Sequence, residues 1–217
     1  MPFSQRLAPN TICSADQLFE VVQFLKQRTK LRVLCCGAGA HLTALIKVSK
    51  ERQHTLIVWE SNEERLSAVQ RWLRRDRVDC DIELRYLEMH DIELRYMEMP
   101  EPAQASYGWY SFAPAISPVD VLIEAAELGL PGRWGAGPSG VQLLTPSGVI
   151  FVCGTRENPA KSNLMKFWAK CGLTVDETNS TGLIYLRRAV EAEVPVDRVN
   201  VGIRQQLRQF FSRTNKA

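Results

Sequence analysis

Two glycines and one glutamate are spaced as in a site for a nucleotide-containing ligand. Gly37 and Gly39 lie in the turn "GAGAH", directly after the apolar run "LRVLCC". Glycine in such a turn tolerates a positive φ angle, and the missing Cβ lets a ligand touch backbone amides. Glu60 follows 21 residues after Gly39, at the end of the apolar run "HTLIVWES". A carboxylate there can accept hydrogen bonds from both ribose hydroxyls of an adenosine-containing cofactor.

Parts of this pattern also fit a plain turn or a dinucleotide site. A tight turn followed by an exposed, non-functional glutamate has the same spacing, because such turns are frequent in α/β folds. A nicotinamide dinucleotide site would need a third glycine, as G-x-G-x-x-G, for close packing of helix and strand. Leu42 stands at that third position and would push the helix away. The dinucleotide interpretation is therefore disfavoured.

Strand-like and helix-like segments alternate around this turn. Ser14 is a plausible N-cap for a first helix with apolar residues at helical spacing. The predicted strands cover 31–37, 54–61, 81–89, 118–126, the end of 137–154, and two strands within 173–189; the predicted helices cover 14–30, 41–52, 62–76, the start of 137–154, and 163–172. In 137–154 we expect a short helix, a Pro-Ser-Gly turn and a strand. The last two strands surround a turn at 180–182 and should form a hairpin.

This alternation predicts right-handed βαβ units and a mostly parallel sheet between two helical layers. We therefore expect residues 1–217 to form one three-layer α/β domain with a C-terminal antiparallel hairpin. Its core would cover about residues 17–189, and a basic helix would cover about residues 197–213.

A tandem repeat interrupts the pattern. Residues 81–90, "DIELRYLEMH", are followed by residues 91–100, "DIELRYMEMP", and the copies differ at two positions. Two copies of ten residues cannot stack into a core of their own, so they do not indicate a solenoid. We expect one copy to form the core strand and the other to extend it or pair with it. The sequence does not distinguish the two copies.

The segment "VLCCGAGAH" resembles the first motif of class I S-adenosylmethionine-dependent methyltransferases, hydrophobic-hydrophobic-acid-x-G-x-G-x-G. Gly37 and Gly39 match its first two glycines, whereas Cys35 stands at the acid and His41 at the third glycine. The segments "SGVQLLTPSGVIFVC", "NLMKFWAKCGLTVDET" and "GLIYLRRA" are similar to later elements of the family, in the same order. The resemblance covers about residues 17–189 and implies a Rossmann-like fold with S-adenosylmethionine as cofactor.

The resemblance also implies roles for individual residues. Glu60 would hold the ribose, and the acid facing the adenine would be Glu88 or Asp91, or Glu98 in the second copy. The implied cofactor-binding residues are Cys36, Gly37, Ala38, Gly39, His41, Glu60, Ser61, Glu88 and Asp91.

The methyl acceptor would meet the end of the fourth strand, at Ile123 and Glu124. Methyl transfer is an in-line displacement that mainly needs aligned reactants in a dry site, and sometimes removal of a proton. It needs no catalytic triad, and the sequence has none. Glu124 is the candidate catalytic residue, with a solvated strand-end acid as the alternative. No Asn-Pro-Pro-Tyr-like motif follows, which argues against the amino-methylating DNA enzymes.

The composition is that of an ordinary globular protein, with 45% apolar and 24% charged residues. No apolar run approaches the roughly 18 residues that cross a bilayer, and the N-terminus has no apolar segment of a secretory signal. The cysteines are Cys13, Cys35, Cys36, Cys80, Cys153 and Cys171. They form no C-x-x-C pair and several lie in apolar runs, so we expect reduced thiols in a cytoplasmic protein. With three dispersed histidines, the sequence predicts no metal site.

The net charge of +3 is mildly basic. Basic residues cluster in "RWLRRDR" (71–77) and in the predicted helix over 197–213. For that helix we expect docking on the body or on a partner first, and contact with nucleic acid phosphates or a membrane surface second. The oligomeric state and the methyl acceptor stay open.

Three functions follow from these patterns. The first is an S-adenosylmethionine-dependent methyltransferase of unknown acceptor. The second is a non-catalytic protein with the same fold, in which Cys35 and His41 have eroded the cofactor motif and the basic surface carries the function. The third is an NAD-dependent oxidoreductase, which Leu42 and the terminal hairpin disfavour.

Overall fold

The structure is a computed structural model, and it describes residues 13–78, 80–92, 107–110, 116–125, 137, 139–154, 161–178 and 180–189. The predicted basic helix over 197–213 and Glu98 in the second repeat copy lie outside these residues. No helix of the described part is long and apolar enough to cross a membrane.

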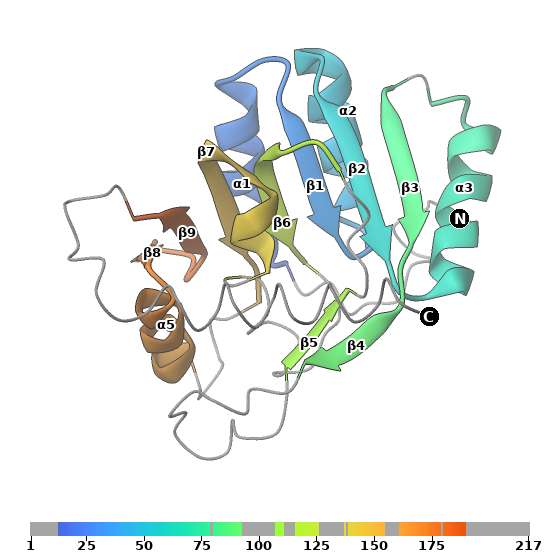
Figure 1. Cartoon of the computed structure of the whole chain (residues 1–217). Helices are drawn as coiled ribbons and strands as arrows, with labels where there is room; N and C mark the ends of the chain where they lie inside the picture. Colours follow the sequence, from blue (N-terminus) through green and yellow to red (C-terminus); the bar gives the residue numbers. More distant parts are fainter. Residues whose placement is uncertain are drawn as a thin grey trace.

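Seven strands form one mixed sheet in the order β3-β2-β1-β6-β7-β9-β8 (Figure 1). The strands are β1 (Arg32–Cys36), β2 (Thr55–Glu60), β3 (Ile82–Tyr86), β6 (Val119–Glu124), β7 (Leu144–Val152), β8 (Leu173–Glu177) and β9 (Ile184–Arg188). The neighbours from β3 to β7 pair in parallel, whereas β9 is antiparallel to both β7 and β8. The mostly parallel sheet and the antiparallel C-terminal hairpin are thus confirmed.

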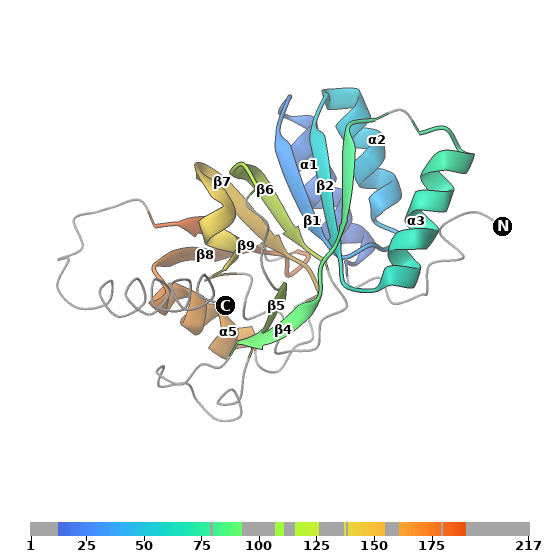
Figure 2. The ribbon, with the colours of Figure 1, turned by 45° about the vertical axis from the view of Figure 1, so that its right-hand side comes forward.

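Helices cover both faces of this sheet. The helices are α1 (Ala15–Lys26), α2 (Leu42–Arg52), α3 (Glu63–Arg75) and α5 (Lys161–Lys170), with the short 3-10 helix η2 (Gly140–Leu143) before β7. Alternate residues of β1 show the two layers. Val33 and Cys35 pack with residues of α1, α2 and α3, whereas Leu34 and Cys36 pack with residues of α5. The arrangement of these helices around the sheet can be followed in Figure 2. The predicted three-layer α/β architecture is confirmed.

The ends of α1 and α5 follow the signals in the sequence. Ser14 is the N-cap of α1, and its hydroxyl accepts a hydrogen bond from the amide of Gln17 while the Gln17 side chain accepts one from the amide of Ser14. Gly172 follows α5 with φ +78°, a left-handed conformation that suits glycine after a helix.

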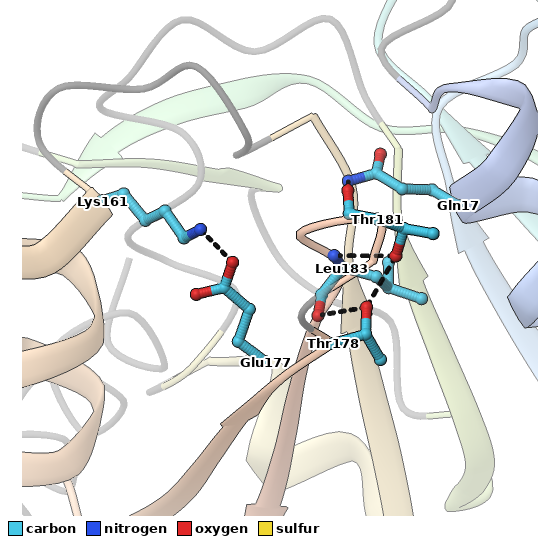
Figure 3. Close-up of polar contacts among 6 residues, drawn as sticks. All are labelled: Gln17, Lys161, Glu177, Thr178, Thr181 and Leu183. Carbon is cyan, nitrogen blue, oxygen red and sulfur yellow. Dashed lines mark hydrogen bonds and ion pairs between the residues drawn. The ribbon is translucent and has the colours of Figure 1, made fainter.

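Gln17 then attaches α1 to the far end of the sheet. Its side chain is 1% exposed, and its Nε2 donates to the carbonyl of Thr181 at 3.3 Å (Figure 3). Its Oε1 accepts from the amide of Gly154, directly after β7, at 3.0 Å. An ion pair between Lys161 and Glu177 ties α5 to β8 nearby. Through Gln17, α1 thus holds both the β8–β9 turn and the end of β7.

The repeat divides between two sheets. The first copy supplies β3, which is an edge of the main sheet. The strand β4 (Met89–Ile92) spans the junction of the copies and pairs antiparallel with β5 (Tyr107–Tyr110) as a separate two-stranded sheet. The first copy is therefore the core strand, and the start of the second pairs with β5, which has no counterpart among the predicted strands.

One predicted turn is wrong. Thr145, Pro146, Ser147 and Gly148 lie inside β7. Here the register between β6 and β7 jumps from Val119↔Leu144 to Val121↔Val149. This irregularity accommodates a proline that cannot donate to the ladder. This irregularity requires glycine at position 148, because a Cβ there would lie 2.9 Å from Leu144 Cβ and 3.1 Å from the Val119 carbonyl oxygen.

Candidate functional site

The candidate site lies where the carboxyl ends of β1, β2 and β6 meet. Cys36 at the end of β1 is in register with Trp59 of β2 and with Glu124 of β6. The chain reverses its direction of travel across the sheet at β1, since β2 lies on one side of it and β6 on the other. Ligands of open α/β sheets bind at such switch points.

The two glycines of the turn after β1 are required for different structural reasons. Gly37 has φ +95°, where a side chain would be strained, and its amide donates to the Trp59 carbonyl at 2.7 Å. A Cβ on Gly39 would lie 2.9 Å from both Cε1 and Nδ1 of His41. Gly39 therefore leaves room for a side chain of this protein, the imidazole of His41.

Glu60 joins this turn to the next one. The carboxylate is only 3% exposed, so the alternative of a solvated glutamate is wrong. Its Oε2 accepts a hydrogen bond from the amide of Ala38 at 2.7 Å, and its Oε1 accepts one from the amide of Asn62 at 2.8 Å. Each carboxylate oxygen has a second lone pair, so Glu60 retains acceptor capacity for hydroxyl groups. The predicted turn and its acid are in direct contact.

His41 turns inward beneath the same loop. It is 3% exposed, and its Nε2 lies 3.1 Å from the carbonyl oxygen of Gly37 and 3.4 Å from Sγ of Cys35. Because a carbonyl only accepts, we assign the proton to Nε2. Nδ1 is then an acceptor, buried and without a hydrogen-bond partner among the described residues. Burial lowers the pKa of His41 to about 4, against the opposing effect of the Gly37 carbonyl, so the ring is neutral.

Buried thiols and a second carboxylate lie beneath the turn. The thiol of Cys35 donates to the Gly37 carbonyl at 3.5 Å. Burial, with smaller contributions from Cys13, Glu124 and Glu60, raises the pKa of Cys35 well above its ordinary value, so it carries no charge. Glu124 is 1% exposed, and this excludes a solvated strand-end acid.

The remaining predicted residues continue the site along β2 and β3. Ser61 is half-buried beside Glu60. Glu60 is in register with Tyr86, and the Glu60 carbonyl accepts a hydrogen bond from the amide of Leu87 at 3.0 Å. Glu88 directly follows Leu87, and its side chain is exposed. Asp91 lies in β4.

Solved methyltransferase structures share this topology. A methyltransferase from Pyrococcus furiosus superposes with a TM-score of 0.56 at 13% identity, covering 84% of this chain and 87% of that one. The chain has the class I methyltransferase fold. A precorrin-6y C5,15-methyltransferase from Geobacter metallireducens GS-15 gives 0.55 at 13% identity, covering 85% and 96%. SAH-bound PaMTH1, a methyltransferase from Podospora anserina, gives 0.53 at 14% identity, covering 87% and 82%. No protein-family model matches the sequence, and no curated protein is significantly similar to it.

Within this methyltransferase fold, two features of the site were missed by sequence reasoning. One is Asn62, whose amide holds Glu60; its signal was an asparagine before two acids, typical of a helix N-cap, and its side chain does cap α3 through the amide of Arg65 at 2.9 Å. The other is the packing of His41 against Cys35, which no local pattern indicates. In the described part of the chain, no group of three or more His, Cys, Asp or Glu side chains is arranged to hold a metal ion.

Proposed function

We propose that the chain binds S-adenosylmethionine at the carboxyl ends of β1 and β2 and is a methyltransferase of unknown acceptor. The observation that carries this proposal is the 2.7 Å hydrogen bond between the Ala38 amide and Glu60. It brings a buried carboxylate against a turn in which Gly37 is conformationally required. A ribose diol needs such an acceptor, held rigidly beside backbone that a ligand can approach.

The residues fit the adenosine half of this cofactor better than its aminoacyl half. Glu60 has spare acceptor capacity, and Ser61, Glu88 and Asp91 follow the adjacent strands. Near the aminoacyl half, the uncharged thiol of Cys35 stands at the usual acid position. Bound S-adenosylmethionine would supply an electrophilic methyl group, and the buried carboxylate of Glu124 is the candidate to position an acceptor or remove its proton.

A second function has an observation in its favour. The His41 imidazole fills the space beside Gly39 and contacts Cys35, so both departures from the family motif meet at one point. A chain that no longer uses the cofactor could keep such a self-filled turn. The alternative is a non-catalytic protein of the methyltransferase fold.

Calorimetric titration with S-adenosylhomocysteine tests the proposal. We expect micromolar binding by the intact chain, a loss of at least about tenfold in Glu60→Ala, and no change in Glu63→Ala. Glu63 is the matched control, because it is an exposed glutamate three residues away at the start of α3. Circular dichroism of each variant establishes that it is folded.

The remaining outcomes select among the alternatives. No binding by the folded chain would overturn the cofactor proposal and favour the non-catalytic protein. Binding of NADH in preference to S-adenosylhomocysteine would indicate the oxidoreductase. A gain of affinity in His41→Gly, which restores the third glycine of the motif, would show that the imidazole obstructs the site.

A further inference from the structure

Positive charge is concentrated at the amino ends of β1, β2 and β3, opposite the carboxyl ends that form the candidate site. The turns α1–β1, α2–β2 and α3–β3 lie side by side there, because β1, β2 and β3 are parallel neighbours. We call the segments 26–32, 50–55 and 74–81 of these turns the basic edge. They contain nine Lys and Arg against four Asp and Glu, an excess of five, whereas the whole chain has a net charge of only +3.

Hydrogen bonds hold the first two turns in one arrangement. His54 is buried between them, with its Nδ1 accepting from the amide of Leu31 at 3.1 Å and its Nε2 3.2 Å from the carbonyl of Leu25. The amide of Lys30 donates to the Arg52 carbonyl at 3.1 Å, and Nε of Arg52 donates to the Arg28 carbonyl at 3.0 Å. The cations of these turns are therefore presented on a fixed backbone.

The backbone conformation supports a role for two of these side chains. Lys30, Gln53 and Arg77 are the three non-glycine residues of the described chain with positive φ, at 55°, 58° and 47°, and one lies in each turn. Glycine would relieve the strain of this left-handed conformation. Strained residues that persist point to a function for their side chains.

The helix dipole accounts for neither Lys30 nor Arg77. Lysine and arginine in the last turn of a helix are stabilised by the helix dipole, which explains Lys26, Lys50 and Arg74. Lys30 and Arg77 lie beyond the helix ends, are exposed, and make no ion pair with another described residue. No described carboxylate pairs with either charge.

The apolar surface argues against a membrane or a protein partner. Among the residues whose side-chain exposure the structure describes, the exposed large hydrophobic residues are Phe19, early in α1, and Tyr86, at the carboxyl end of β3. Neither belongs to the basic edge. Membrane-surface binding needs apolar side chains among the cations, and stable protein interfaces need an apolar or aromatic centre. Rows of phosphates need only fixed cations.

We propose that the basic edge binds the phosphate backbone of nucleic acid without reading base sequence. Strands β1–β3 separate it from the turn at Gly37 and from Glu60, so it anchors nucleic acid without occupying the candidate cofactor site. This inference does not depend on the proposed function.

Fluorescence anisotropy of the full chain with a short labelled RNA duplex tests it at several salt concentrations. In the double variant Lys30→Gly/Arg77→Gly we expect on the order of tenfold weaker binding, and a slope of log K against log salt reduced by about 1.8. The melting temperature should be unchanged or higher, because glycine relieves the left-handed strain.

Gln53→Gly is the matched control, since it relieves the same strain in the middle turn without removing a charge. It should bind the duplex as the unaltered chain does. The proposal is overturned if the intact chain does not bind the duplex, if the double variant keeps the full salt slope, or if Gln53→Gly loses as much affinity. It is also overturned if the double variant loses binding to phosphatidylserine vesicles and not to the duplex.

Discussion

Glu60 and Ala38 are joined by a hydrogen bond of 2.7 Å, although they follow different strands of the sheet. The second oxygen of the same carboxylate holds Asn62 at 2.8 Å. One buried side chain therefore connects the turns after β1 and β2, and any ligand that uses the Ala38 amide must compete with it. Glu60 has a structural role besides the binding role proposed for it.

We predict that Glu60→Gln destabilises the fold. The amide can present only one acceptor oxygen, so either the buried N–H group of Ala38 or the partly buried N–H group of Asn62 loses its partner. The free energy of unfolding should fall by about 1–3 kcal/mol, measured by urea denaturation. Glu63→Gln, at an exposed position, should stay within about 0.5 kcal/mol of the unaltered chain. Equal stability of Glu60→Gln and the unaltered chain would contradict the connection between the turns.

Gly39→Ala should destabilise the protein through one identifiable contact. The new methyl would lie 2.9 Å from Cε1 and Nδ1 of His41, inside van der Waals distance. The loss should therefore be recovered in part by Gly39→Ala/His41→Ala, with a coupling free energy of about 1–3 kcal/mol in a double-mutant cycle. Additive effects of the two substitutions would mean that the imidazole does not occupy that space.

Stability should depend on pH through His41. Its pKa is lowered by burial from 6.5 to about 4, so between these values the unfolded chain binds the proton more readily than the folded one. The contribution is therefore complete above pH 6.5 and is lost as the pH falls toward 4, by up to about 3 kcal/mol.

NMR titration of the His41 ring checks this directly, with a midpoint expected near 4. Burial also lowers the pKa of His54, so the pH profile of the unaltered chain contains both groups. The difference between that profile and the profile of His41→Gln isolates His41. A His41 midpoint near 6.5 would contradict the buried, neutral ring.

Gln17→Leu should loosen the end of β7. The substitution removes the acceptor of the Gly154 amide and the donor to the Thr181 carbonyl, at a position that is 1% exposed. Hydrogen exchange at the Gly154 amide should accelerate, and the unfolding free energy should fall by about 1–3 kcal/mol. Gln27→Leu, exposed at the other end of α1, should change neither quantity.

Much of the fold was predictable because most local signals agree with the topology. Ser14 and Gly172 mark helix ends by their own chemistry, and the buried runs of β1 and β2 match strands covered on both faces. The Pro-Ser-Gly segment misled because its turn composition lies inside β7. There the pairing with the neighbouring β6 jumps in register, and the segment continues the strand instead of reversing the chain.

The site was predictable to the level of its elements. The spacing of Gly37 and Glu60 follows from strand and helix lengths, so their meeting at one edge could be expected. The bond from Ala38 to Glu60 and the inward turn of His41 depend on side-chain packing between elements. Such packing leaves no periodic trace in a sequence.

The duplicated segment contains a second copy of the sequence that forms the edge strand of the sheet. Residues 82–86 form β3 with the sequence "IELRY", and residues 92–96 repeat that sequence letter for letter. An edge strand has one hydrogen-bonded neighbour, here β2, so replacing it requires no other strand to be rebuilt. Deletion of either ten-residue copy would thus leave β2 a chemically identical partner, although it would also remove half of β4.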